Sequence, residues 1–310
     1  MRLLVTGGAG YIGAVLVPAL LDAGHMVTVI DNFRYGQASL LPIAHREHLR
    51  IVRGDARDEA LMRRELKDID AILPLAALTG APVCDKFPDE ARLVNLEAVK
   101  LILALRRPEQ KVIFPTTNSG YGIGEKDKQC TEETPLRPVS LYGRLKVEAE
   151  QAVLRSGNAM TLRLATVFGV SPRMRLDLLV NDFAYRALRE GFLVLFEPHF
   201  RRNYIHVRDV ARAFLHCLAH FEMLKGEAYN VGLSSANLSK RQLAEEIKKQ
   251  APSLVIIDAP VGFDPDKRDY IVSNEKFEKT GFQAQVTLKE GIAELIRGYA
   301  ALPSDPFRNQ

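Results

Sequence analysis

The sequence predicts an α/β fold in which a parallel sheet carries helices on both of its faces. Short apolar runs, typical of buried strands, alternate with helical stretches through the first half of the 310-residue chain. The first such run, residues 3–5, leads directly into a glycine-rich segment and then into a helical pattern. Because parallel strands must be joined by crossover connections, this alternation predicts a doubly wound sheet.

Three glycines follow the first predicted strand, at positions 7, 10 and 13. Without a Cβ atom, Gly7 and Gly10 allow a tight turn and the close approach of a phosphate, and Gly13 lets the next helix pack on the strand. The N-terminus of that helix offers unpaired N–H groups to a diphosphate. The order of strand, glycines and helix therefore predicts a dinucleotide-binding segment of the Rossmann type.

An acid follows the second strand, which is predicted over residues 26–30. Asp31 comes 18 residues after Gly13, where a carboxylate should meet the adenosine ribose of a dinucleotide. A carboxylate accepts hydrogen bonds from a ribose 2′-hydroxyl and repels a 2′-phosphate, so Asp31 favours NAD over NADP. Arg34 weakens this preference because its charge would attract the phosphate.

Small and polar residues follow three further strands, which are predicted over residues 49–52, 71–75 and 111–115. Asp55 follows the first, Ala76 and Ala77 the second, and Thr116 and Thr117 the third. The carboxyl ends of parallel strands meet at one edge of the sheet, so these residues should face the same crevice as the glycine loop. Helices are predicted over residues 90–106 and 177–189.

Tyr142 and Lys146 are four residues apart, so on a helix they share one face. A free phenol has a pKa of about 10, and a neighbouring cation favours the phenolate. Such a tyrosine can take a proton from a substrate hydroxyl, although the same spacing is also common on solvated helix faces. Thr116, Thr117 and Ser119 could hold a substrate oxygen opposite this base, and the pattern leaves open which of them points inward.

Composition excludes several classes of protein. The net charge is +4, with no basic block and no tryptophan, so no nucleic-acid partner is expected. No apolar run reaches the roughly 20 residues needed to cross a bilayer, and the predicted strand at the N-terminus leaves no room for a signal peptide. Three cysteines at unrelated spacings favour a reducing, cytoplasmic location and argue against a metal cluster.

Taken together, these segments resemble the extended short-chain dehydrogenase/reductase family, and more narrowly its NAD-dependent nucleotide-sugar epimerases and dehydratases. In the first half, the resemblance rests on the glycine loop, Asp31, Asp55, Leu75-Ala76-Ala77, Thr117 before Tyr121-Gly122, and the Tyr142/Lys146 pair. In the second half, it rests on residues 163–169 (with Phe168 in place of the usual tyrosine), 202–210 and 229–232, and on Arg268 followed by Ser273. It covers nearly the whole chain.

The resemblance implies a role for each matching residue. Tyr142 would deprotonate a sugar hydroxyl, Lys146 would hold the nicotinamide ribose and lower the pKa of the phenol, and Thr117 would orient the hydroxyl. The residues implied to bind NAD, besides Tyr142 and Lys146, are Gly7, Gly10, Tyr11, Ile12, Gly13, Asp31, Asn32, Asp55, Ala56, Leu75, Ala76, Ala77 and Asn95. Those implied to bind the nucleotide sugar are Asn118, Asn181, Arg202 and Arg268, with the arginines suited to its diphosphate.

One departure from the family pattern narrows the expected reaction. The sugar 4,6-dehydratases of this family carry Asp-Glu directly after the threonine, because elimination needs its own acid and base. Here those positions hold Asn118 and Ser119, which favours a 4-epimerase or a 4-dehydrogenase. Residues 116–125 and 173–177 also resemble enzymes acting on GDP-linked manno-heptose, including a 4-dehydrogenase.

Three other functions are compatible with parts of the sequence pattern. They are a 4,6-dehydratase, a 4-keto-sugar reductase that uses NADP, and a non-enzymatic dinucleotide-binding protein. Asp31 speaks against the reductase, and the presence of both Tyr142 and Lys146 speaks against the non-enzymatic protein.

The expected architecture has two parts. Residues 1–170 should form the NAD-binding Rossmann domain, to which residues 202–225 return. Residues 171–310 should form a smaller, mixed α/β region that binds the nucleotide sugar. Relatives commonly pair through a four-helix contact that uses the helix carrying the tyrosine, so a homodimer is expected.

Overall fold

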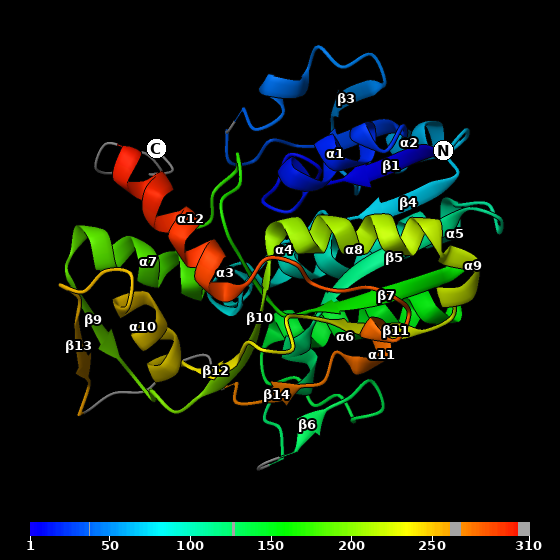
Figure 1. Cartoon of the computed structure of the whole chain (residues 1–310). Coiled ribbons are helices and arrows are strands. Elements are labelled where there is room, and N and C mark those ends of the chain that lie inside the picture. Colours follow the sequence, from blue (N-terminus) through cyan, green and yellow to red (C-terminus); the bar gives the residue numbers. More distant parts are fainter. Residues whose placement is uncertain (37, 126–127, 261–267, 303–310) are drawn as a thin grey trace.

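A seven-stranded sheet forms the centre of the computed structural model, which describes residues 1–36, 38–125, 128–260 and 268–302 (Figure 1). All neighbouring strands are parallel, in the order β11-β7-β5-β4-β1-β2-β3. The strands are β1 (Arg2–Thr6), β2 (Met26–Asp31), β3 (Leu49–Arg53), β4 (Ala71–Pro74), β5 (Lys111–Thr117), β7 (Ala159–Leu164) and β11 (Ala228–Val231). This confirms the doubly wound parallel sheet predicted from the sequence.

Helices cover both faces of the sheet. On one face lie α1 (Gly13–Asp22) and α8 (Val207–Ala219), which pack against each other. On the other lie α2 (Glu59–Glu65), α5 (Ala98–Leu105) and α6 (Leu141–Arg155). Successive residues of β1 alternate between the two layers, since Leu3 and Val5 belong to the core under α1 and α8 whereas Leu4 belongs to the core under α5 and α6. Burial on both faces explains why the strands read as continuous apolar runs.

The predicted helix over residues 90–106 is interrupted. It consists of α4 (Pro88–Arg92), a π-helical turn over Leu93–Glu97, and α5. The wider turn contains the buried Asn95, whose amide donates to the carbonyl oxygen of Leu78 and accepts from its N–H, both at 2.8 Å. The turn therefore fixes the loop that follows β4. The apolar periodicity of the sequence does not reveal a π-helical turn of this kind.

The second half of the chain builds a smaller region beside the sheet, at the left of Figure 1, and also returns to the sheet through α8 and β11. Helix α7 (Leu179–Arg189) begins two residues after the predicted start at Asp177. The small sheets pair β10 (Arg201–His206) with β8 (Thr166–Phe168) and β12 (Asn237–Ser239), β9 (Phe192–Leu195) with β13 (Val255–Asp258), and β6 (Gln129–Cys130) with β14 (Ile271–Val272). The division at residue 170 stays a prediction.

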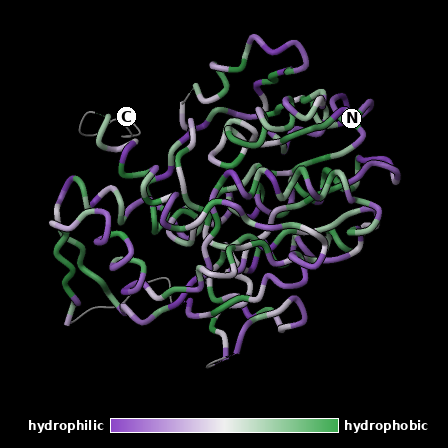
Figure 2. Tube along the Cα trace, in the orientation of Figure 1, coloured by the Kyte–Doolittle hydropathy of each residue, from purple (hydrophilic) through white to green (hydrophobic). Residues whose placement is uncertain are grey.

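The remaining helices connect these parts. They are α3 (Ala81–Lys86), α7 (Leu179–Arg189), α9 (Phe221–Leu224), α10 (Lys240–Lys248), α11 (Glu275–Glu278), α12 (Leu288–Ala301), and two 3₁₀ turns at Leu41–Ile43 and Asn118–Tyr121. No helix within the described residues is long and apolar enough to cross a membrane. Figure 2 shows that β9 and most of β13, before its terminal Asp258, are hydrophobic, and side chains such as Phe192 and Val255 are exposed.

A buried ion pair fixes α6 to β7 and to the turn after β5. Both Arg163 and Glu150 are buried, and the guanidinium donates to the carboxylate through Nη2 at 2.7 Å and through Nε at 3.1 Å. Arg163 also donates to the hydroxyl of Tyr121 at 3.0 Å, and that hydroxyl donates to Asn230 Oδ1 at 2.7 Å. The network thereby holds three segments around the helix that carries Tyr142.

We expect Glu150→Gln to lower the free energy of unfolding by about 3–5 kcal/mol, because it leaves the Arg163 charge buried without its counter-charge. Urea unfolding measures this difference. The control is Glu59→Gln on α2, which removes an exposed ion pair with Arg63 and should cost less than about 1 kcal/mol. Equal effects of the two substitutions would contradict the role given to the buried pair.

Candidate active site

A cavity of about 830 Å³ lies at the carboxyl ends of β1, β2, β4 and β5. One end is formed by residues that follow β2 and β3, among them Asp31 and Asp55. Tyr142, Lys146 and Thr117 line it farther along, beside residues from the second half of the chain such as Arg175. The site is therefore built where the ends of parallel strands meet, as the topology of such sheets requires.

Most residues predicted for the site line this cavity. They are Gly7, Gly10, Tyr11, Ile12, Gly13, Asp31, Asn32, Asp55, Ala56, Leu75, Ala76, Ala77, Thr117, Tyr142, Lys146, Arg202 and Arg268. Three asparagines from the prediction do not line it and are buried, namely Asn95, Asn118 and Asn181. Asn95 and Asn181 support the cavity wall through hydrogen bonds to residues that line it.

The glycine loop packs directly against the strand beside it. Gly7 has a φ of +70°, and a Cβ atom built on it would lie 2.6 Å from the backbone Cα of Ala76. A Cβ atom on Gly13 would lie 2.4 Å from the carbonyl oxygen of Gly8. With glycines at these places, the N-terminus of α1 opens onto the cavity without obstruction, so the loop fits a diphosphate.

Charged groups at the end of the cavity that follows β2 and β3 are held by neighbouring backbone and side chains. The carboxylate of Asp31 accepts from the N–H groups of Ala9 at 3.0 Å and Phe33 at 2.8 Å. Both oxygens keep a further lone pair for a ribose hydroxyl. Asp55 accepts two hydrogen bonds from Arg57, at 2.8 and 2.7 Å, and these lower the pKa of Asp55 to about 2.

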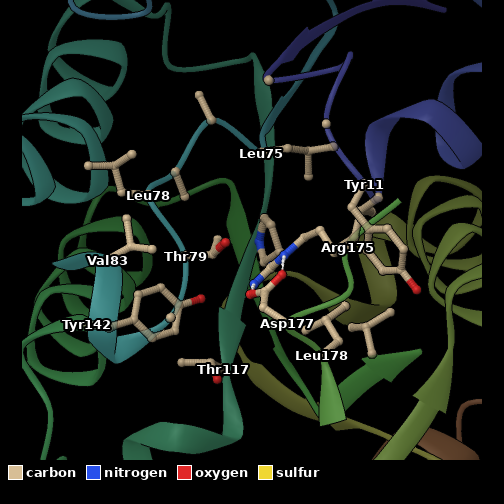
Figure 3. A pocket seen from close by; sticks show the side chains of 18 of the residues that line it. Tyr11, Leu75, Leu78, Thr79, Val83, Thr117, Tyr142, Arg175, Asp177 and Leu178 are labelled. Carbon is tan, nitrogen blue, oxygen red and sulfur yellow. Dashed lines mark hydrogen bonds and ion pairs between the residues drawn. The ribbon is translucent and has the colours of Figure 1, made fainter. Parts of the chain in front are cut away.

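Tyr142 and Thr117 approach the cavity from different elements. Tyr142 is the second residue of α6, whose first turn is capped by the Ser140 hydroxyl, which accepts from the N–H of Gly143 at 3.1 Å. Thr117 ends β5, and its hydroxyl donates to Ser119 Oγ at 2.9 Å. Figure 3 shows the side chains of Tyr142, Thr117 and the Arg175–Asp177 pair around the same space.

Burial opposes the charging of both members of the Tyr142/Lys146 pair. It raises the pKa of Tyr142 to about 12, and the charges that act in the other direction are those of Arg175 and Arg268. Burial also lowers the pKa of Lys146 to about 7, against the attraction of Glu150. The ammonium nitrogen lies 3.9 Å from the centre of the Phe114 ring. The spacing of the pair alone therefore does not produce a phenolate in the protein, because the desolvation cost is larger.

Arg175 and Asp177 belong to the site, although the sequence suggested no individual role for them. Both residues lie on the segment that joins β8 to α7, and both line the cavity. Arg175 Nε donates to Asp177 Oδ1 at 3.1 Å. The amide of Asn181 donates to the carbonyl oxygen of Arg175 at 2.9 Å, and its oxygen accepts from the N–H of Gly169 at 3.0 Å. The signal in the sequence was a cluster of arginines after residue 171, which does not by itself separate a cavity residue from a solvated one.

Several basic residues from the second half of the chain line one wall of the cavity. Arg268 donates to the hydroxyl of Ser119, and Arg202 Cζ lies 5.8 Å from the centre of the Tyr270 ring. The cationic lining residues from this half are Arg173, Arg175, Arg202, Lys240 and Arg268. Among the described lining residues from this half, Asp177 is the one with a carboxylate. The wall is therefore net positive and suits an anionic group. Within the described part of the chain, no three His, Cys, Asp or Glu side chains are grouped to hold a metal ion.

Fold and cavity together define an NAD-binding oxidoreductase scaffold of the extended short-chain dehydrogenase/reductase type. Residues 3–232 match the NAD-dependent epimerase/dehydratase family, and the chain belongs to this family of nucleotide-sugar enzymes. NAD is its cofactor.

Relatives include both epimerases and dehydratases. A UDP-glucose 4-epimerase of Azospirillum brasilense is 31% identical over 81% of this chain and 79% of its own length. A dTDP-D-glucose 4,6-dehydratase of Mus musculus is 25% identical over 96% of this chain and 88% of its own length. The family is therefore established, and both epimerases and dehydratases are similar to this chain.

Similar solved structures also include both activities. The Thermus thermophilus UDP-glucose 4-epimerase in complex with NAD has a TM-score of 0.84 and 28% identity, covering 97% of this chain and 99% of that one. A dTDP-glucose 4,6-dehydratase from Streptomyces venezuelae, solved with NAD, also has a TM-score of 0.84 and 28% identity, covering 97% of each chain. Overall similarity therefore does not separate the two activities.

We expect Lys146→Met to be more stable than the wild type at pH 6, with an advantage that shrinks as the pH rises towards 10. The folded pKa of Lys146 is lowered to about 7, whereas a free lysine has a pKa of about 10.4. Between these values the unfolded chain binds the additional proton, so the wild type gains stability with rising pH and the methionine variant lacks that gain.

Urea unfolding at pH 6, 8 and 10 measures this change. Lys100→Met, at an exposed position on α5, is the control and should show a difference that barely depends on pH. A stability difference at Lys146 that grows with pH would refute the burial of its charge.

Proposed function

We propose that the chain oxidises a hydroxyl of a nucleotide sugar, at C4, as a 4-epimerase or a 4-dehydrogenase, with Tyr142 as the proton acceptor. One observation carries the proposal. Tyr142, Thr117 and Lys146 line the same cavity as the glycine loop and Asp31, so a base and a hydroxyl face the space next to a dinucleotide-binding loop. Bound NAD would accept the hydride from the sugar carbon.

The side chains of this chain would carry the proton and hold the substrate. Thr117 can hydrogen-bond the reacting hydroxyl and orient it towards the phenol. Arg175 and Arg268 favour the phenolate of Tyr142, which must form against the cost of burial. Lys146 lies one helical turn away and can donate to a ribose hydroxyl. Arg202 and Arg268 are proposed to bind the diphosphate of the sugar nucleotide.

The surroundings of Thr117 support oxidation over elimination of water. Asn118 is buried and does not line the cavity, and the hydroxyl of Ser119 is engaged by Thr117 and Arg268. Asp177 is also a poor proton donor. Burial raises its pKa, but the hydrogen bond and charge of Arg175 outweigh this and lower the pKa overall. A 4,6-dehydratase needs a general acid near the reacting carbon, and none of these groups meets that need at neutral pH.

A panel of UDP-, GDP-, CDP- and dTDP-sugars tests the reaction. Product mass is measured together with the absorbance of NADH. An isomer of unchanged mass identifies a 4-epimerase, and accumulation of NADH with a product lacking two hydrogens identifies a 4-dehydrogenase. A product that has lost water would overturn the proposal in favour of a dehydratase.

Tyr142→Phe should lower kcat by about 10²–10⁴-fold, the usual range for loss of a general base, while the affinity for NAD changes little. Tyr185→Phe is the matched control, because Tyr185 lies on α7 and is absent from the residues that line the cavity. Turnover by the Tyr142 variant at the wild-type rate would remove the phenol from the mechanism.

We further propose that the enzyme is a homodimer paired through α6, as its relatives' four-helix contact suggests. Arg144, Glu148 and Gln151 are exposed on this helix and would become partly covered in the pair. Light scattering measures the mass directly, and a monomer at micromolar concentration would contradict the pairing.

A further inference from the structure

An ion pair crosses the adenosine end of the cavity. Arg34 lies on the loop after β2, and its Nη1 donates to Oε1 of Glu90, which lies on α4. The guanidinium carbon of Arg34 is also 5.7 Å from the centre of the Phe87 ring. Both charged residues line the cavity, so the pair joins two elements on either side of its rim.

The other charged side chains near this end have partners of their own: Arg173, whose guanidinium carbon lies 4.1 Å from the centre of the Tyr35 ring, donates to the carbonyl oxygen of Met174 at 2.9 Å. Asp31 accepts from the N–H groups of Ala9 and Phe33, and Asp55 is bound by Arg57. Arg34 is therefore the cation on the loop directly after Asp31 that could turn towards a phosphate on the adenosine ribose. Its engagement with Glu90 directs it towards α4.

We propose that Glu90 determines cofactor specificity: by binding Arg34 it withholds the cation that would attract a 2′-phosphate, and so it helps to exclude NADP. This rests on the proposed placement of the adenosine ribose beside Asp31. With Glu90 present, its carboxylate neutralises Arg34, and Asp31 repels a 2′-phosphate. Without Glu90, the net charge at this edge rises by one and Arg34 can form a charge-assisted hydrogen bond to the phosphate.

The pair contributes little to the fold, which makes this role separable from a structural one. Its side chains are 34% and 29% exposed, and ion pairs of such exposure contribute at most about 1 kcal/mol to stability. Glu90 is also in the short helix α4, whose continuation through α5 is packed on the core by residues such as Ala91 and Val99. Glu90→Gln should therefore fold normally.

Dissociation constants of NAD and NADP for the purified protein test the proposal, measured by titration calorimetry on wild type and variants. Glu90→Gln should tighten NADP binding roughly tenfold and change NAD binding less than about twofold. Asp89→Asn is the matched control, because it removes a charge from the neighbouring, exposed position without releasing Arg34. Its ratio of NADP to NAD affinity should remain that of the wild type.

The double variant Glu90→Gln/Arg34→Ala isolates the cation and should lose the gain in NADP affinity. Unchanged NADP binding in Glu90→Gln, or a gain that persists without Arg34, would overturn the proposal. Equal weakening of both nucleotides would do the same, since it would show that Glu90 only supports the loop. Because these are binding measurements, they stand apart from the turnover assays, which alone decide whether the sugar is oxidised.

Discussion

The close approach of the glycine loop to the end of β4 is the contact on which the rest of the site depends. No Cβ atom fits between Gly7 and the backbone of Ala76, and none fits between Gly13 and Gly8. The loop can therefore lie flat on the sheet and leave the N-terminus of α1 facing the cavity. Residues after β2, β3, β4 and β5 then surround the same space, because parallel strands end at one edge.

Within that space, the cost of burying charge decides how the side chains behave. Tyr142 resists losing its proton, and Lys146 resists keeping one, because neither is well solvated. The arginines that offset this cost for Tyr142 come from the second half of the chain, at positions 175 and 268. Helix α6 thus carries the phenol, while a segment distant in sequence supplies the charges that partly offset the cost of ionising it.

Contacts across long stretches of sequence hold the two halves of the site together. The hydroxyl of Tyr11, in the glycine loop, donates to the carbonyl oxygen of Gly169 at 2.7 Å and lies 3.3 Å from the amide nitrogen of Asn181. The same asparagine holds the backbone of Arg175. The glycine loop and the segment that contains Arg175 are consequently linked by one buried side chain, although Asn181 itself does not line the cavity.

The sequence by itself determined the sheet, the glycine loop, the position of Asp31 and the face shared by Tyr142 and Lys146. These features are local: each depends on the period of a strand or helix, on the absence of a Cβ atom, or on a fixed spacing along the chain. Only the tertiary structure decided that Arg34 binds Glu90, that Arg175 and Asp177 line the cavity, and that Asn95, Asn118 and Asn181 are buried away from it. These outcomes depend on which segments fold against one another and on how much water is excluded between them, and neither quantity can be read from spacing along the chain.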